Sequence, residues 1–324
     1  MAELRYFEAI NQALFEEFER DERVFIFGED VGLVGGTFRV TEGLMAEFGG
    51  RRVRDTPIAE AVIVGLAIGA AAGGMRPIAE LMTMNFGIVA MDQIVNHAAK
   101  MRYMFGGQLK LPLVIRAPGG GGTQKAAQHS HSIESWFMNT PGLRVAIPAT
   151  PADAKGLLKT AIRMDDPVIF IEHEMLYSTR GEVPEGEYLT PFGAAHVARP
   201  GRDVTIVAWS RMLLESLQAA ERLAEEGIEA EVVDPRTLDP LDFDTILASV
   251  LRTRRAVIVE EGWRNVGVGA EIAARLQEHL FYDLEAPIQR VAAADVPTPY
   301  ARNLETLALP SADDVVRAVL KIVL

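Results

Sequence analysis

Short hydrophobic runs, often β-branched, alternate along the whole chain with longer stretches whose apolar residues recur at helical spacing. In the first half the short runs predict strands at Val24–Phe27, Ile78–Leu81, Leu113–Arg116, Val145–Ile147 and Val168–Ile171. The stretches between them predict helices at Tyr6–Glu19, Ala59–Ala72, Ile88–Met104 and Pro151–Met164. Such alternation is typical of an α/β fold, in which helices cover both faces of a mostly parallel sheet.

The pattern breaks between residues 177 and 202, where glycine and proline are frequent. A second alternating set follows, with predicted strands at Val204–Ala208, Ala230–Val233, Ala256–Val259 and Ile288–Val291. Its predicted helices are Leu213–Glu226, Phe243–Leu251, Gly269–Leu280 and Ala312–Val323. We therefore expect one domain at residues 1–176, a linker at 177–202 and a second domain at 203–324.

Composition narrows the possible partners. A formal net charge of −13 argues against nucleic acid as a partner. The absence of cysteine excludes disulfides, thiolate metal sites and a cysteine nucleophile. The longest apolar run, Ala61–Gly73, is too short and too rich in glycine to span a bilayer, so we expect a soluble, cytoplasmic protein. An apolar content of 49% suggests surfaces that are buried against other subunits.

Glu60 stands at the start of an apolar helix with no nearby residue to neutralise it. Thr56 is a candidate N-cap and Pro57 suits the first turn. Small and β-branched residues on every side predict that this helix is buried all round. A carboxylate in this position either complements the helix dipole or is held for chemistry.

Other candidate residues follow predicted strands, where open α/β sheets place their sites. Glu29 follows the first strand and Met82–Phe86 follows the second. A third segment, the glycine-rich loop Pro118–Gly122, leads to His129 and His131. This loop lacks the Gly-Lys-Ser/Thr ending of a phosphate-binding P-loop, so a mobile loop is the better interpretation. The two histidines could share a metal ion, but the sequence offers no third ligand near them.

Together these segments resemble the β subunit of a thiamine-diphosphate-dependent 2-oxo acid dehydrogenase, most of all the pyruvate dehydrogenase type. The resemblance covers essentially the whole chain. It is carried by Gly28–Val31, Asp55–Glu60, Met82–Phe86, Asp92–Ile94, Ala127–Ser130, Asp153–Leu158 and Val232–Leu238. It implies a transketolase-like pyrimidine-binding domain followed by a transketolase C-terminal-like domain.

The resemblance also assigns roles to residues. It implies that Glu60 hydrogen-bonds the aminopyrimidine ring of thiamine diphosphate. Burial against the apolar helix leads us to expect, in addition, a shared or retained proton on this carboxyl group. His129 would orient the substrate or the lipoyl group at the entrance. The remaining contacts to the cofactor would come from Glu29, Ile58, Met82 and Phe86. Ordinary core packing is the alternative for Met82 and Phe86, and a solvated loop end is the alternative for Glu29.

Partners and ions are implied in the same way. The diphosphate and its magnesium would be held by an α subunit through a Gly-Asp-Gly motif, which this sequence lacks. The expected assembly is therefore a heterotetramer of two α and two β chains, docked through the C-terminal domain onto a dihydrolipoyl acyltransferase core. A structural potassium ion would be bound, largely by backbone carbonyls, at Leu113, Ala161, Ile162, Met164 and Asp166.

Several functions remain open from the sequence. Oxidative decarboxylation of pyruvate is preferred, with acetoin cleavage and branched-chain 2-oxo acids as alternative substrates. A non-catalytic scaffold that binds the acyltransferase core is a different class of function, and retention of Glu60 and His129 argues against it. A nicotinamide-dependent oxidoreductase is disfavoured, because Gly267–Glu271 lacks the third glycine of a dinucleotide fingerprint.

Overall fold

The computed structural model describes residues 1–323, and the chain divides into two compact units. Unit 1 consists of Met1–Gly119 and Trp136–Phe192, and unit 2 consists of Gly120–Ser135 and Gly193–Leu324. The segment Gly120–Ser135, which the sequence assigns to the first domain, therefore packs with unit 2. The domain limits given above remain a prediction.

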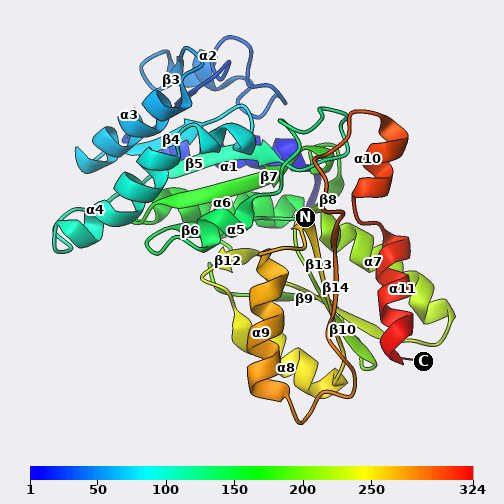
Figure 1. Ribbon diagram of the computed structural model, residues 1–324. Helices are drawn as coiled ribbons and strands as arrows, with labels where there is room; N and C mark the ends of the chain where they lie inside the picture. Colours follow the sequence, from blue (N-terminus) through cyan, green and yellow to red (C-terminus); the bar gives the residue numbers. More distant parts are fainter. Residues whose placement is uncertain (324) are drawn as a thin grey trace. The chain divides into compact units, whose positions relative to one another are not determined.

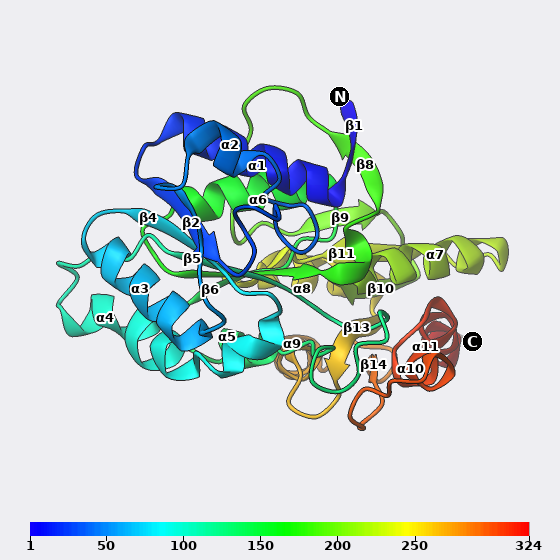
Figure 2. The same ribbon diagram turned by 90° about the horizontal axis from the view of Figure 1, so that it is seen from above.

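Unit 1 is built on a parallel sheet with the strand order β6-β7-β5-β4-β2-β3. These strands are β2 (Val24–Gly28), β3 (Val53–Asp55), β4 (Arg76–Glu80), β5 (Val114–Gly119), β6 (Arg144–Ala146) and β7 (Val168–His173). Helices α1 (Tyr6–Arg20) and α6 (Pro151–Arg163) lie on one face of this sheet, and α3 (Glu60–Ala72) and α4 (Ala99–Met104) lie on the other (Figure 2). The expected three-layer arrangement is confirmed.

The smaller elements of unit 1 were mostly missed by the sequence pattern. They are β1 (Ala2–Arg5), α2 (Leu44–Phe48), η1 (Met84–Ile88), η3 (Glu174–Leu176) and β8 (Arg180–Val183); α5 (Glu134–Met138) straddles the unit boundary. The predicted helix Ile88–Met104 was only partly right, because its middle is a π-helical segment, η2 (Asp92–Ala98), that continues into α4. In a π-helix each hydrogen bond spans five residues instead of four, so η2 interrupts the regular α-helical hydrogen bonding before α4.

Unit 2 repeats the same plan around the sheet β14-β13-β10-β11-β9, in which only β9 runs antiparallel. The strands of this sheet are β9 (His196–Arg199), β10 (Val204–Ala208), β11 (Ala230–Asp234), β13 (Ala256–Trp263) and β14 (Gln289–Ala293). Unit 2 also contains the short strand β12 (Thr237–Asp239). Helices α8 (Phe243–Thr253) and α9 (Val268–Leu280) lie on one face, and α7 (Arg211–Glu225) and α11 (Ala312–Val323) lie on the other (Figure 1). A short helix, α10 (Arg302–Ala308), precedes α11.

The segment 177–202, which the sequence predicts to be a linker or hairpin, contains two short strands. Within it, β8 pairs antiparallel with β1, and β9 forms an edge of the unit 2 sheet. Such pairings join residues far apart in the sequence, so local composition gives no sign of them. None of the helices formed by residues 1–323 is both long and apolar enough to cross a membrane.

Candidate active site

The carboxyl ends of β2 and β4 position the first group of candidate residues. β2 and β4 approach so closely that a Cβ at Gly28 would lie 2.1 Å from the carbonyl oxygen of Glu80, so only glycine fits there. The chain then returns after β3, where the Thr56 amide donates to the Gly28 carbonyl at 2.9 Å. This arrangement holds Glu29 and the segment leading to Glu60 at one end of the sheet.

Glu29 and Glu60 form a pair of buried carboxyl groups, with exposed fractions of 4% and 5%. Burial, together with the charge of Glu60, raises the pKa of Glu29 to about 7. A hydrogen bond from the Met82 backbone acts in the opposite direction and lowers this pKa. Oε1 of Glu29 is buried without a hydrogen-bond partner among the described residues. The sequence singled out both carboxylates, but it gave no sign that Glu29 would be the one with a pKa near neutrality.

The expected N-cap of α3 was wrong. The helix begins at Glu60 itself, its N-cap is Ala59, and no side chain accepts a hydrogen bond there. Thr56 is held at the strand end by the bond from its amide to the Gly28 carbonyl, and it precedes the first helical residue by four positions. An N-cap side chain reaches only the amides two or three residues further on, so Thr56 lies too early to cap this helix. The buried hydroxyl oxygen of Thr56 has no hydrogen-bond partner in the described part of the chain.

The expectation that α3 is buried on every side was also wrong for the chain by itself. Val62 and Leu66 are 57% and 58% exposed, and Ile58, just before the helix, is 76% exposed. Val62 and Leu66 are spaced four apart and therefore share one side of the helix, and Ile58 precedes it. They define an apolar stripe, which we call the α3 stripe.

Met82 and Phe86 follow β4, and both are half-buried. Phe86 belongs to η1, whose other residues Met84, Asn85 and Gly87 are buried. Glu29, Glu60 and Met82 thus lie together in unit 1, where the Met82 backbone bonds to Glu29. His129 belongs to unit 2.

A buried ionic network lies within the same sheet. Arg116 on β5 forms a two-pronged interaction with Glu172 on β7, with Nη2 donating to Oε2 at 2.6 Å, and it also contacts Glu80 on β4. Tyr177 donates to Glu172 at 2.6 Å. All four residues are buried. Burial raises the pKa of Glu80, and its charge contributes to the raised pKa of Glu29.

The carbonyls predicted to bind potassium already accept hydrogen bonds. Nη1 of Arg76 donates to the carbonyls of Ile162 and Met164, both at 2.9 Å. Leu113 accepts from the Val168 amide and Ala161 from the Met164 amide. A guanidinium at this position repels a second cation, so these groups fit potassium poorly. Asp166 pairs with Arg102. The potassium site therefore remains a prediction, and no role depends on it below.

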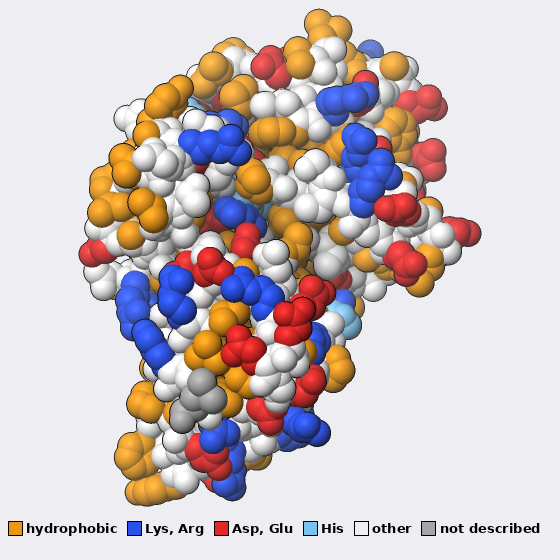
Figure 3. Space-filling model, turned by 90° about the vertical axis from the view of Figure 1, so that its right-hand side faces the viewer, with side chains coloured by type: hydrophobic (Ala, Val, Ile, Leu, Met, Phe, Trp, Pro, Cys, Tyr) orange, Lys and Arg blue, Asp and Glu red, His pale blue; other side chains and the backbone are white. Residues whose placement is uncertain are grey.

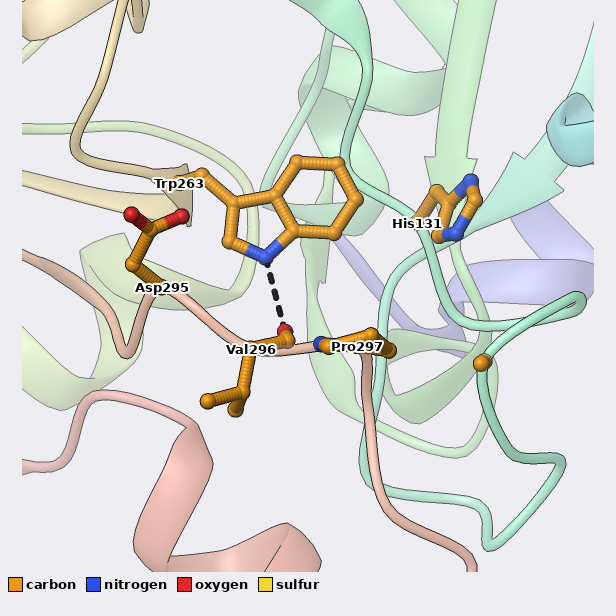
Figure 4. Close-up of a pocket in the computed structure, with 6 residues that line it drawn as sticks. His131, Trp263, Asp295, Val296 and Pro297 are labelled. Atoms are coloured by element: carbon orange, nitrogen blue, oxygen red, sulfur yellow. Dashed lines mark hydrogen bonds between the residues drawn. The ribbon is translucent and has the colours of Figure 1, made fainter.

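His129 is half-buried on the glycine-rich loop of unit 2, and its neighbour His131 lines a pocket of about 360 Å³. Burial lowers the pKa of His131. Its ring lies 5.1 Å from the ring of Trp263, whose indole donates to the Val296 carbonyl at 3.1 Å (Figure 4). The remaining lining residues are Ala127, Asp295 and Pro297. Residues 1–323 contain no group of three His, Asp or Glu side chains that could hold a metal ion.

The sequence analysis missed a set of buried carboxyl groups around this loop. Glu134 accepts from the Trp209 indole at 3.0 Å, and burial raises its pKa to about 7. Glu261 and Glu305 accept hydrogen bonds from backbone amides of the loop itself. Glu261 and Glu305 are far from the loop in the sequence, so no local motif links them to it. The one available signal is the presence of glutamate within a stretch of apolar residues, which is unusual for a side chain exposed to solvent.

Comparison with known proteins gives a consistent result over the whole chain. The family model described as transketolase, pyrimidine binding domain matches residues 2–179, and the model described as transketolase, C-terminal domain matches residues 193–315. Among solved structures, a chain described as split gene transketolase, inactive beta4 tetramer is similar, with a TM-score of 0.79 and 28% identity. That match covers 99% of this chain and 98% of the other.

Curated relatives are more similar in sequence. The chain is 50% identical over 315 residues to the pyruvate dehydrogenase E1 component subunit beta of Rickettsia felis, with 97% of each chain covered. It is 48% identical over 315 residues to the mitochondrial protein of that name from Dictyostelium discoideum, covering 96% of this chain and 88% of the relative.

Proposed function

Because the chain belongs to the transketolase-like family of β subunits of the pyruvate dehydrogenase E1 type, we propose that it acts in the oxidative decarboxylation of pyruvate, with transfer of the acetyl group to a lipoyl group. The observation that carries the proposal is the buried pair Glu29 and Glu60 at the carboxyl end of the unit 1 sheet. Carboxyl groups of this kind are costly to bury unless a partner satisfies them.

This pair fits the aminopyrimidine of thiamine diphosphate. Oε1 of Glu29 is buried without a hydrogen-bond partner among the described residues, so it is available to a polar ring. When bound, thiamine diphosphate supplies the electron-accepting ring that the loss of carbon dioxide requires. Glu60 would hold the ring and exchange a proton with its nitrogen, while Phe86 and Met82 would pack beside it.

The pKa of about 7 gives Glu29 a supporting role in the same proposal. Near neutral pH Glu29 is therefore close to half-protonated. A proton on Glu29 reduces the repulsion between the two neighbouring carboxyl groups when they share a site.

An α subunit completes this proposal. The α3 stripe of Ile58, Val62 and Leu66 leaves an apolar surface exposed beside the carboxylate pair, as expected of a face that another chain covers. We infer that an α chain packs there, contributes the magnesium and diphosphate half of the site, and forms a heterotetramer of two α and two β chains. This sequence contains no Gly-Asp-Gly, so it lacks that half of the site.

The acyltransferase core is the proposed partner of the C-terminal domain. The candidate acidic residues for this contact are Asp283, Glu285 and Asp295. The terminal carboxylate at Leu324 is a fourth candidate and lies outside the described residues. Glu285 pairs with Arg254 and Arg255, and Asp295 accepts from Asn265, which leaves less free charge than the sequence suggests. Acidic and basic side chains are also interspersed over the face shown in Figure 3.

A cytoplasmic location stays part of the proposal for a bacterial-type enzyme of glycolytic carbon metabolism. The relative from Rickettsia felis has no organelle in its name, whereas the relative from Dictyostelium discoideum is named as mitochondrial.

The test is co-expression with an α subunit of the same enzyme type. The purified complex is assayed with pyruvate, a branched-chain 2-oxo acid and acetoin, first with an artificial electron acceptor and then with a lipoyl domain. Pyruvate should be the preferred substrate, and the chain purified alone should turn over none of the three. Preference for acetoin or for the branched-chain acid would reassign the substrate. No turnover by a complex that binds thiamine diphosphate would refute the catalytic role.

A further inference from the structure

The glycine-rich loop of unit 2 has the backbone geometry of an anion-binding nest. Gly120 and Gly122 have φ angles of +84° and +100°, and Gln124 and Ala126 have φ angles of 58° and 64°. The Gly120 amide donates to the His131 carbonyl at 3.1 Å, which closes the base of the loop. Alternation of left-handed residues turns successive amides toward one point, where they attract negative charge.

In this chain the nest already contains two of the protein's own carboxylates. Oε1 of Glu261, on β13, accepts from the Gly121 amide at 2.7 Å and from the Ser132 hydroxyl at 3.1 Å. Oε1 of Glu305, on α10, accepts from the Gly122 amide at 2.9 Å, and its Oε2 accepts from the Gln124 amide at 3.1 Å. Glu261 and Glu305 are 7% and 2% exposed, so water competes little for these bonds.

Glu305 bonds two backbone amides of the loop, whereas Glu261 bonds one. Its two oxygens bond the amides of Gly122 and Gln124, one of which belongs to a non-glycine residue in the left-handed region. That conformation is unfavourable for glutamine and persists only where the surroundings impose it. Charge-assisted bonds to the backbone are among the stronger hydrogen bonds in proteins, which suits them to this task.

We propose that Glu305 is a positioning residue. Its carboxylate occupies the nest as an anion supplied by the protein itself, and it thereby fixes the positions of His129 and His131 on the loop. The inference rests on the proposed function, because His129 is the residue through which Glu305 would affect acyl transfer. The loop leaves the nest at Gln124 and reaches His129 five residues later. Ala127 and His131, from the same loop, line the pocket. His131 lies across from Trp263 (Figure 4).

The proposal also accounts for the missing phosphate signature. The loop has the geometry of an anion site but lacks the lysine of a P-loop. Its amides donate instead to Glu261 and Glu305, two carboxylates of the same unit. Inorganic phosphate should therefore have no access to these amides while Glu305 is present. Removal of the Glu305 side chain should create a small anion site instead.

The experiment uses the assembled complex carrying Glu305→Ala, with Glu278→Ala on the exposed side of α9 as the matched control for loss of one glutamate. Two properties are measured: reductive acylation of a lipoyl domain, and the ¹⁹F resonance of Trp263 after incorporation of 5-fluorotryptophan, assigned with Trp263→Phe. Each measurement is repeated with added formate and with the same concentration of chloride. Formate carries the carboxylate that the variant lacks.

We expect Glu305→Ala to shift the Trp263 resonance and to lower the rate of reductive acylation by about 10-fold or more, because small displacements of positioned groups are costly in rate. Formate should restore both toward the wild-type values, chloride should not, and Glu278→Ala should behave as wild type. An unchanged resonance and rate in Glu305→Ala would overturn the proposal. So would losses that formate does not restore, since they would indicate a purely structural role.

The two proposals fail in distinguishable ways. If wild-type complex acylates no lipoyl domain, the proposed function is refuted, while the Trp263 resonance still tests whether Glu305 holds the loop. If acylation proceeds normally in wild type and in Glu305→Ala alike, the proposed function stands and the positioning role is refuted. A second variant, Glu305→Gln, tests the requirement for charge and should have an intermediate effect if Glu305→Ala does not fold.

Discussion

Glu134 makes the stability of this protein depend on pH in a way that one substitution should remove. Its side chain is buried at the start of α5, with Oε1 accepting from the Trp209 indole at 3.0 Å. Burial, together with the charges of Glu260 and Glu261, raises the pKa of Glu134 from 4.5 to about 7. The folded state therefore binds a proton that the unfolded chain releases above its own pKa.

The direction and size of the effect follow from this difference. Between pH 4.5 and 7 the folded state holds more protons than the unfolded state, so the free energy of unfolding falls as the pH rises. The contribution is fully present below the unfolded pKa and is lost by about pH 7. At ~1.4 kcal/mol for each pH unit between the two values, the loss is roughly 3 kcal/mol. For a unit of this size that corresponds to about 5 °C or more in the unfolding temperature.

The assay is thermal unfolding of the wild type and of Glu134→Gln from pH 5 to pH 8.5. Glutamine keeps an acceptor for the Trp209 indole but does not titrate, so the variant should lose less stability across this range. The comparison concerns the change in the free energy of unfolding with pH, because any effect of the amide itself is the same at every pH and cancels. Glu278→Gln, at an exposed position, is the control for loss of one charge. Parallel pH profiles for wild type and Glu134→Gln would refute the raised pKa of Glu134.

Three other outcomes are expected. His129→Ala should lower reductive acylation more than decarboxylation measured with an artificial electron acceptor, and equal losses would point to a role in positioning the substrate. Arg116→Met should destabilise the protein by about 3–5 kcal/mol in denaturant unfolding, because Glu80 and Glu172 are left buried without their cation; a cost below ~1 kcal/mol would contradict this. Replacement of potassium by choline should leave the unfolding temperature unchanged, since Arg76 already contacts two of the proposed ligand carbonyls; a large drop would establish the ion site.

The elements that the sequence predicted well are those with strong local signals. The helix Ala312–Val323 was predicted with its observed bounds, because its apolar residues keep a regular helical spacing. The start of α6 also has a local signal, because Thr150 precedes Pro151 and accepts from the Asp153 amide at 3.1 Å as the N-cap. The family resemblance and the two-domain α/β fold are confirmed by the comparisons. In each case the information lies within a short stretch or a recognised motif.

The failures arise where distant residues decide the structure. β8 exists because β1, about 180 residues earlier, pairs with it, and no local pattern reveals such a partner. The Gly122 amide of the glycine-rich loop donates to Glu305, 183 residues away, and no local pattern reveals this partner either. Thr56 looked like a helix cap because its local sequence suits one, but the strand end engaged its backbone first.

The candidate site shows the same division. Glu29 was found from its place after a predicted strand and Glu60 from its place at the start of an apolar helix, and the structure brings the two close enough for Glu60 to raise the pKa of Glu29. The raised pKa of Glu29 depends on burial and on the approach of Glu60, so it could be read only from three-dimensional coordinates. Their predicted roles toward the cofactor, and that of His129, remain predictions.

The central claim is that Glu60 exchanges a proton with the cofactor inside a site completed by an α subunit. The most direct measurement is the rate of hydrogen–deuterium exchange at the thiazolium C2 of thiamine diphosphate bound to the assembled complex, compared between wild type and Glu60→Gln. The account predicts that the variant retains the cofactor and that its exchange slows by about 100-fold or more. Exchange at the wild-type rate in a Glu60→Gln complex with cofactor bound would contradict it.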